Sequence, residues 1–166
     1  MKSRIFFLFL IVAFTFGSLV SCTHEKEFTH CELTMVLDKS FTEEESEEYD
    51  LLLTDGEVII SVIRLSFVAA LESGIYDTYT AEEFARFFMY QGGKDGDLLI
   101  RGGIPYYTYT EEYNGSSFFH TLTFYRSYNA YFIVGYSIGG DKSDSHIDRF
   151  LEYAEGVYFN DAPIIN

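Results

Sequence analysis

The sequence has few basic side chains, few cysteines and no hydrophobic run long enough to span a membrane. Among its 166 residues, 11 are Lys or Arg and 26 are Asp or Glu, which gives a formal net charge of −15. We therefore expect no nucleic-acid partner, because such binding needs clustered cations that displace counterions. The longest apolar run, Ile5–Phe16, is shorter than the ~20 residues of a membrane-spanning helix. The apolar fraction of 48% nevertheless predicts one folded domain.

The familiar signatures of catalysis and metal binding are also missing. The chain has no G-x-S-x-G motif, and its Gly92–Gly96 segment lacks the Gly-Lys-Ser/Thr ending of a phosphate-binding loop. Neither C-x-x-C nor H-x-x-x-H spacing occurs. We therefore expect a non-enzymatic protein without a cofactor. An extracytoplasmic hydrolase or metal-binding protein with an unrecognised site is the alternative.

The N-terminus has the pattern of a bacterial lipoprotein signal. Lys2 and Arg4 precede the apolar run, which leads to Leu19-Val20-Ser21-Cys22. This ending resembles a lipobox, in which an aliphatic residue and two small or tolerated residues precede Cys. The resemblance implies that residues 1–21 are removed as a signal peptide and that Cys22 carries a diacylglyceryl group and a further acyl chain such as palmitate. The protein would then be anchored to the outer face of the cell membrane. An ordinary cleaved signal and an uncleaved anchor are the alternatives.

Removal of the signal changes both the charge and the cysteine count. Nine basic side chains then stand against 26 acidic ones, a net charge of −17, so we expect anionic headgroups to repel the domain and hold it off the bilayer. We expect residues 22–30 to form the lipidated Cys and a short polar tether, and residues 31–166 to form a single domain. With Cys22 lipidated, Cys31 has no intrachain partner. We expect its thiol to be buried, with pairing between chains as the alternative.

Two acidic segments are candidates for metal binding. Glu43–Asp50 lies in a stretch with six acidic residues in nine. This density predicts a solvated loop or helix start, with calcium binding as the alternative, although the EF-hand pattern is absent. Asp141, Asp144, His146 and Asp148 lie around the start of the last predicted helix, where carboxylates complement the helix dipole. These four are weak metal candidates.

The pattern of apolar residues predicts an α+β domain. A capping box at Thr80–Glu83 begins a helix that ends at Gly92, and Ser143 or Ser145 begins a second helix that ends at Gly156. A helical turn is expected around Phe67–Ser73. Apolar runs predict strands at Leu33–Leu37, Leu51–Leu53, Val58–Leu65, Gly96–Glu112, Ser116–Arg126, Ala130–Ile138 and Val157–Phe159. We therefore expect an antiparallel sheet of about six strands with helices packed on its faces.

Two dipeptides predict tight hairpin turns that determine how strands pair. Asp55-Gly56 and Asn114-Gly115 are both typical of two-residue type I′ turns. Counting back from Asn114-Gly115 places Tyr109 opposite His120. We expect His120 to be a hydrogen-bonded core residue, with a role as a catalytic base as the alternative.

The chain also resembles a known group of proteins. The phrases LTMVL (Leu33–Leu37), AYFIV (Ala130–Val134) and FLEYAEGVYF (Phe150–Phe159) stand in the same places as in short lipoproteins of Gram-positive anaerobic bacteria. Those proteins are similar to the PsbP-like fold group, which includes the PsbP and DcrB families. The resemblance implies an antiparallel sheet with helices on its faces over Glu32–Asp161. It carries over no catalytic residue, because the group has no common active site.

The abundance of tyrosine favours a role in recognition. The chain has 14 Tyr, of which Tyr106, Tyr113, Tyr125, Tyr128 and Tyr131 cannot all be core residues. Exposed tyrosine is favoured at binding surfaces, since its ring is apolar and its hydroxyl polar. Together with the expected lipid anchor, this predicts a non-enzymatic binding or accessory module of unknown ligand, with a protein partner in the cell envelope.

Overall fold

The apolar runs form strands and the capped segments form helices in the computed structural model, which describes residues 25–93 and 96–160. The predicted signal peptide 1–21 and Cys22 lie outside the described residues. The strands are β1 (Glu25–His30), β2 (Leu33–Asp38), β3 (Thr42–Glu44), β4 (Leu51–Thr54), β5 (Val58–Ser66), β6 (Leu99–Arg101), β7 (Ile104–Tyr113), β8 (Ser116–Arg126), β9 (Ala130–Gly139) and β10 (Val157–Phe159). The helices are α2 (Phe67–Glu72), α3 (Ala81–Gln91) and α4 (Asp144–Glu155). None of these described helices is long and apolar enough to cross a membrane.

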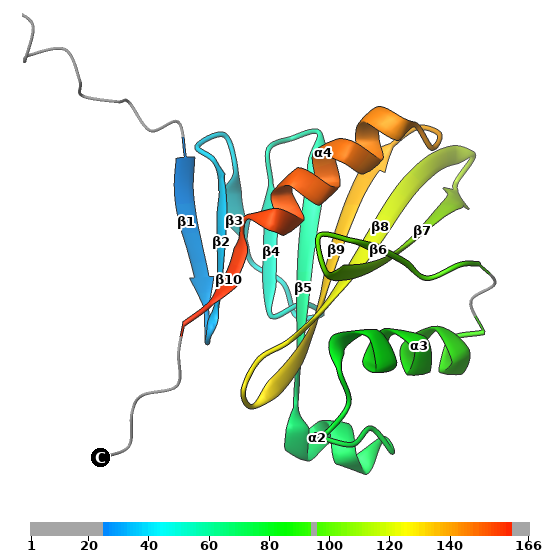
Figure 1. Cartoon of the computed structure of the whole chain (residues 1–166). Helices are drawn as coiled ribbons and strands as arrows, with labels where there is room; N and C mark the ends of the chain where they lie inside the picture. Colours follow the sequence, from blue (N-terminus) through cyan, green and yellow to red (C-terminus); the bar gives the residue numbers. More distant parts are fainter. Residues whose placement is uncertain (1–24, 94–95, 161–166) are drawn as a thin grey trace, which may run out of the picture.

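The strands form two antiparallel sheets (Figure 1). A small sheet has the order β1-β2-β10, and a larger sheet of seven strands has the order β3-β4-β5-β9-β8-β7-β6. The predicted class, α+β with an antiparallel sheet and helices on its faces, is confirmed. The larger sheet has seven strands where about six were expected, and a second, smaller sheet lies beside it. Two segments not predicted as strands, β1 and β3, join the sheets, and one predicted strand is divided.

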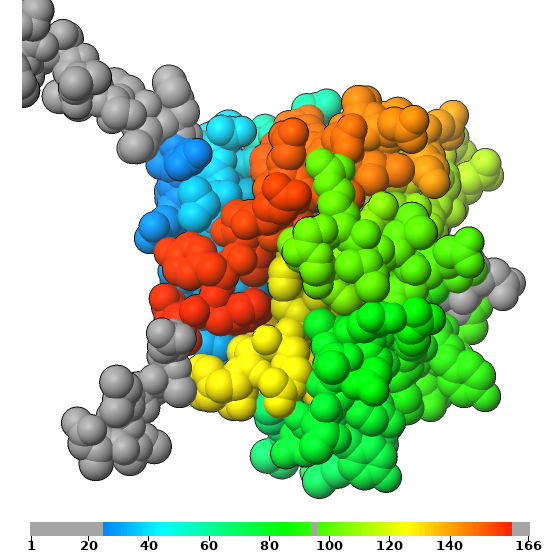
Figure 2. Space-filling view, viewed as in Figure 1, coloured from blue at the N-terminus to red at the C-terminus, as the bar shows by residue number. Residues whose placement is uncertain are grey.

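The two faces of the seven-stranded sheet carry separate cores. Neighbouring residues of β9 show this, since Phe132 packs in the core beneath the small sheet and α4, whereas Tyr131 packs in the core beneath α2 and α3. From α4, Phe150, Leu151 and Ala154 are buried in the first core. Figure 2 shows α4 and β10, in orange to red, lying against the blue strands β1 and β2. The helices therefore cover opposite faces of one sheet.

Residues 25–30, expected within a polar tether, form strand β1 instead. All six pair with β2, from Glu25 opposite Asp38 to His30 opposite Leu33, and Phe28 is buried. An edge strand of this kind needs little apolar surface, and polar residues protect its free side. The polar composition that indicated a tether is therefore compatible with an edge strand.

Cys31, expected to be buried, is exposed. It lies in the turn between β1 and β2, since His30 and Leu33 pair on either side, and its φ is +52°. Its position in a tight turn, rather than its residue type, determines its exposure.

The two predicted hairpin turns have different outcomes. Asn114 and Gly115 both have positive φ, +52° and +77°, so the type I′ prediction is confirmed there. At Asp55-Gly56 the same prediction is wrong, because only Gly56 has a positive φ, of +91°. The Asp55 carboxylate instead accepts hydrogen bonds from the backbone N–H groups of Glu57 (2.9 Å) and Val58 (2.7 Å) and holds a longer turn.

The predicted strand Gly96–Glu112 is divided in the structure. Gly102 and Gly103 have φ values of +59° and +86°, and they turn the chain between β6 and β7. Consecutive glycines with positive φ allow a two-residue turn within an otherwise apolar run.

The helices begin as predicted. The Thr80 hydroxyl accepts a hydrogen bond from the Glu83 N–H (3.2 Å), and the Glu83 carboxylate accepts one from the Thr80 N–H (2.8 Å), which confirms the capping box of α3. Of the two serines considered for α4, Ser143 is the cap, since its hydroxyl accepts a hydrogen bond from the His146 N–H (3.2 Å). The turn expected around Phe67–Ser73 is helix α2.

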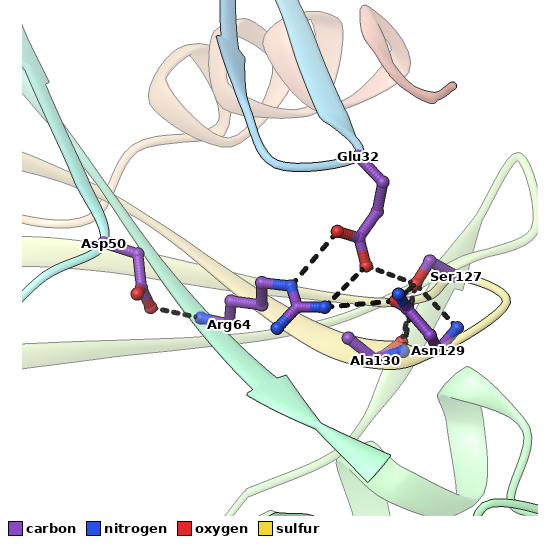
Figure 3. Close-up of polar contacts among 6 residues, drawn as sticks. All are labelled: Glu32, Asp50, Arg64, Ser127, Asn129 and Ala130. Atoms are coloured by element: carbon purple, nitrogen blue, oxygen red, sulfur yellow. Dashed lines mark hydrogen bonds and ion pairs between the residues drawn. The ribbon is translucent and has the colours of Figure 1, made fainter. Parts of the chain in front are cut away.

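A buried ion pair joins the small sheet to the large one (Figure 3). Glu32, in the turn between β1 and β2, is 7% exposed. Its carboxylate accepts hydrogen bonds from the guanidinium of Arg64 in β5 (3.1 and 3.3 Å) and from the hydroxyl of Ser127 (2.9 Å). The same guanidinium donates to the side-chain oxygen of Asn129 (3.2 Å), and the backbone N–H of Arg64 donates to the Asp50 carboxylate (2.6 Å). The network thus connects the turn between β1 and β2, strand β5, and the turn between β8 and β9.

This network stabilises the charged form of Glu32. Burial raises the pKa of a carboxyl group, but the hydrogen bonds from Arg64, from the backbone and from Ser127 outweigh burial, so the pKa of Glu32 is lowered from its usual 4.5. A lowered pKa in the folded state means that Glu32 contributes stability at pH values above its ordinary pKa. That contribution is lost as the pH falls through the folded-state pKa.

We predict that Arg64→Met lowers the free energy of unfolding by about 3 kcal/mol at neutral pH, because it leaves the Glu32 carboxylate buried without its partner. Glu32→Gln keeps the shape and should cost about 1–2 kcal/mol. It should also remove part of the loss of stability between about pH 5 and pH 3. Urea unfolding followed by circular dichroism across this pH range measures all three effects.

The matched control is Glu82→Gln, because Glu82 forms an exposed ion pair with Arg86 (2.8 Å). Such surface pairs contribute about 0–1 kcal/mol. An Arg64→Met protein as stable as the wild type would show that the network does not hold the two sheets together.

Candidate functional site

One face of the seven-stranded sheet is covered by helices over only part of its area. The core beneath α2 and α3 includes Tyr131 of β9 and Phe124 of β8. On the same face of β5, Ile59 and Ile63 are 48% and 40% exposed, although both are large apolar residues. The face therefore has an uncovered part beside α3.

This uncovered part contains a groove, which we call the α3 groove. It has an apolar end of about 460 Å³ and a polar end of about 310 Å³. Both ends are lined by Ile63, Phe88 and Ile133, so they form one continuous depression. The apolar end is also lined by Leu65, Ser73, Ile75, Phe84, Phe87 and Gln91. The polar end is also lined by Tyr49, Ser61, Tyr109, Glu111, His120, Leu122, Gly135 and Ser137.

Small residues of β5 and β9 form the floor of the polar end. Strand pairing places Ser61 opposite Gly135, and Gly135 opposite Leu122. A Cβ atom on Gly135 would lie 2.8 Å from Ser61 Oγ and 3.3 Å from Leu122 Cδ2. A side chain at this position would therefore press on Ser61 and Leu122, and a residue without a side chain keeps the floor of the groove low.

A row of three stacked rings extends to the polar end, where two of them, Tyr109 and His120, line the groove. The rings of Tyr107, Tyr109 and His120 follow one another with centroids 5.7 and 4.7 Å apart and interplanar angles of 19° and 16°. His120 Nδ1 lies 2.7 Å from Ser137 Oγ, and His120 Nε2 lies 4.0 Å from a carboxylate oxygen of Glu111. Burial, together with the negative charge of Glu111, raises the pKa of Tyr109. The ring row is therefore both half-buried and beside a negative charge.

His120 is hydrogen-bonded as predicted, but it is not a core residue. The predicted pairing is confirmed, with Tyr109 directly opposite His120. The side chain is 18% exposed and lines the α3 groove. The local pattern around His120 is that of a buried face, and only the position of α3 on the folded sheet leaves this part of the face open.

Ser137, His120 and Glu111 include the residue types of a nucleophile, a base and an orienting carboxylate. Ser137 lies within β9, paired with Ile59 on one side and His120 on the other, so strand pairing engages the backbone around it. Acyl transfer needs N–H donors free to bind an oxyanion, and a carboxylate hydrogen-bonded to the histidine. A separation of 4.0 Å is too long for that hydrogen bond. Glu111 and His120 therefore lack the hydrogen bond of a serine–histidine–carboxylate triad.

The predicted metal candidates do not converge on one point. Asp141 accepts a hydrogen bond from the hydroxyl of Ser117 (2.9 Å), and Asp148 pairs with Arg101 (2.5 Å), where β6 lies against α4 (Figure 2). Within residues 25–93 and 96–160, no group of three or more His, Cys, Asp or Glu could hold a metal ion. That statement covers the candidates Asp141, Asp144, His146 and Asp148 and the acidic segment Glu43–Asp50.

The tyrosines considered for a surface role divide between core and surface. Tyr125 and Tyr131 are buried, and their hydroxyls donate to backbone carbonyl groups at 3.0 and 2.7 Å. Burial raises the pKa of Tyr125 to about 12. A hydroxyl with a carbonyl partner makes tyrosine acceptable in a core. Tyr106 is partly buried, and Tyr113 and Tyr128 are exposed.

We predict that Gly135→Ala lowers the free energy of unfolding by about 2 kcal/mol, because the new methyl group overlaps Ser61 Oγ. In a Ser61→Ala background the hydroxyl is absent, and the same substitution should cost less than about 1 kcal/mol. Urea unfolding of the two single variants and the double variant measures this coupling. Equal costs in both backgrounds would mean that the loss of stability does not come from contact with the Ser61 hydroxyl.

Comparison with solved structures supports the fold alone. The crystal structure of a protein from Bacteroides thetaiotaomicron, at 1.50 Å resolution, is similar with a TM-score of 0.56 and 13% identity. The match covers 83% of this chain and 49% of that one, so this chain spans about half the length of that protein. The solution structure of cyanobacterial PsbP (CyanoP) from Synechocystis sp. PCC 6803 has a TM-score of 0.43 and 11% identity, over 85% of this chain and 95% of that one. No family model and no curated protein matches. A TM-score of 0.43 is too low to establish a relationship to PsbP, so membership of the PsbP-like group stays a prediction.

Proposed function

We propose that this protein is a lipid-anchored, extracytoplasmic binding module without enzymatic activity, and that its ligand lies in the α3 groove. The groove carries the proposal, because it is present in the fold without rearrangement and combines a large apolar end with a few polar groups. Sites for small molecules have this character. The cluster of Phe84, Phe87 and Phe88 along one wall suits a ligand with an apolar part.

The lipid anchor is supported by the lipobox-like sequence that ends at Cys22. Only Thr23 and His24 lie between Cys22 and the start of β1, a span of about 10 Å when extended. The domain would therefore be held close to the headgroups rather than at the end of a tether. Its net charge of −17 would orient it by repulsion within that short span.

An accessory role with a protein partner in the cell envelope is supported by exposed apolar residues around α2. Val68, Leu71 and Tyr76 are 76%, 59% and 55% exposed. Figure 1 shows α2 at the lower end of the molecule, whereas β1 begins at the upper end. On the proposed anchoring, this surface would face away from the bilayer.

A hydrolase is a second candidate, favoured by the 2.7 Å contact between His120 and Ser137 in an open groove. It ranks below binding because Ser137 lies within a paired strand and Glu111 is too far from His120 for a hydrogen bond.

We predict that the chain incorporates an alkyne analogue of palmitate when it is expressed in a Gram-positive host, and that Cys22→Ala abolishes the label. Cys31→Ala is the matched control, because it removes the other thiol and should leave the labelling unchanged. In-gel fluorescence after click chemistry measures both. Labelling that survives Cys22→Ala but not Cys31→Ala would overturn the proposed anchor.

We predict that the mature polypeptide (residues 22–166 without its lipid) binds the neutral dye N-phenyl-1-naphthylamine saturably, with increased fluorescence. Ile63→Ser should weaken binding by about tenfold, because it removes an apolar wall from both ends of the groove. Ile59→Ser is the matched control, since Ile59 lies on the same face of β5, has similar exposure and does not line the groove. Equal dye affinity in the two variants would place the site elsewhere.

A further inference from the structure

We propose that the ligand of the α3 groove is a cationic amphiphile, such as a hydrophobic amine, with its positive head at the polar end and its apolar part along α3. This inference rests on the proposed binding function and goes further by assigning the charge of the ligand. Three observations support it: a carboxylate lines the polar end, no Lys or Arg among the described residues lines either end, and the apolar end adjoins the polar one.

The polar end offers one formal charge and several hydroxyl groups. Glu111 is the only Asp, Glu, Lys or Arg among the described residues that line it. Its side chain is 63% exposed, and a carboxylate oxygen lies 4.0 Å from His120 Nε2, so the side chain remains accessible to an ammonium group. The hydroxyls of Ser61 and Ser137 and the rings of Tyr49 and Tyr109 complete this end. Carboxylate oxygens, hydroxyl oxygens and aromatic rings all stabilise a cation.

The region beyond the polar end is also negative. Tyr49 lines both the groove and an adjoining hollow of about 570 Å³. The other residues that line this hollow are Glu43, Glu44, Glu45, Ser46, Glu47, Asp50, Leu51 and Leu52. Among the described residues, no Lys or Arg lines either end of the groove or this hollow. Surface charges act over ~8 Å at physiological salt, so the entrance favours cations and disfavours carboxylate or phosphate heads. The charge of Glu111 also raises the pKa of Tyr109, as a negative environment does.

The adjoining apolar end favours an amphiphile over a simple ion as the ligand. Ile63, Phe88 and Ile133 line both ends, so a molecule with its head beside Glu111 would have its apolar part against the phenylalanines of α3. Metal binding would need several carboxylates together, and no such group occurs among the described residues. The groove thus has the division into polar and apolar ends that an amphiphile has.

Three probes with the same chain length and different heads test the proposal, namely n-octylammonium, n-octanol and n-octanoate. Displacement of N-phenyl-1-naphthylamine from the mature polypeptide at low salt gives their affinities. We expect octylammonium to bind about tenfold more tightly than octanoate, with octanol between them, and the difference to shrink as salt is added.

The charge at position 111 is tested separately from the net charge of the protein. Glu111→Gln should weaken octylammonium binding about threefold and leave octanol unchanged. Glu112→Gln is the matched control, because it removes the same charge from the next, exposed residue, which does not line the groove.

Each outcome bears on a defined claim. Octanol binding with no preference for the ammonium head would overturn the inference and leave the binding function standing. Tighter binding of octanoate, or equal effects of the two glutamine variants, would also overturn it. Absence of binding by all three probes and the dye would overturn the proposed function and the inference together.

Discussion

The pairing of β9 with β5 on one side and β8 on the other is the interaction on which both the core and the groove depend. It makes β9 an interior strand with both faces used. Phe132 and Val134 point into the core beneath the small sheet, while Tyr131 and Ile133 point towards the helices. The next residue of β9 on the helix side is Gly135, which lines the groove where the helices no longer cover the sheet. One strand therefore changes from core to groove without any change in its pairing.

Three of the few basic residues of this acidic chain hold the covering layer on the large sheet. Arg64 of β5 binds Glu32 in the small sheet, and Arg101 of β6 binds Asp148 of α4. Arg149 of α4 donates to Asp55 (3.0 Å) and Glu57 (2.9 Å) in the turn after β4, and its pKa is raised mainly by the hydrogen bond to Glu57. Each of these arginines crosses from one layer to the other. These three arginines are thus engaged between layers, while no Lys or Arg among the described residues lines the α3 groove on the opposite face.

Local signals in the sequence predicted local structure well. The turn at Asn114-Gly115 and the capping box at Thr80–Glu83 depend on a few neighbouring residues, and both formed as expected. The Asp55 turn differed because its carboxylate accepts backbone hydrogen bonds that a two-residue turn would not offer. The floor of the groove could not be predicted, since Ser61 and Gly135 meet only through pairing of strands far apart in the sequence. How far α3 extends over the sheet is likewise a property of the packed fold.

The proposed anchor and the proposed ligand are physically consistent with one another. A domain held within about 10 Å of the headgroups samples the layer of solution next to an anionic membrane. Cationic amphiphiles concentrate in that layer, because the surface potential attracts their heads and the bilayer attracts their chains. An acidic protein in the same layer competes with the membrane for them, and its own net charge keeps it from lying flat on the lipid. The net negative charge that argues against nucleic acid as a partner would, together with Glu111, attract the cationic head of the proposed ligand. On the proposed function it would select the head of the ligand, while the phenylalanines of α3 would accommodate the chain.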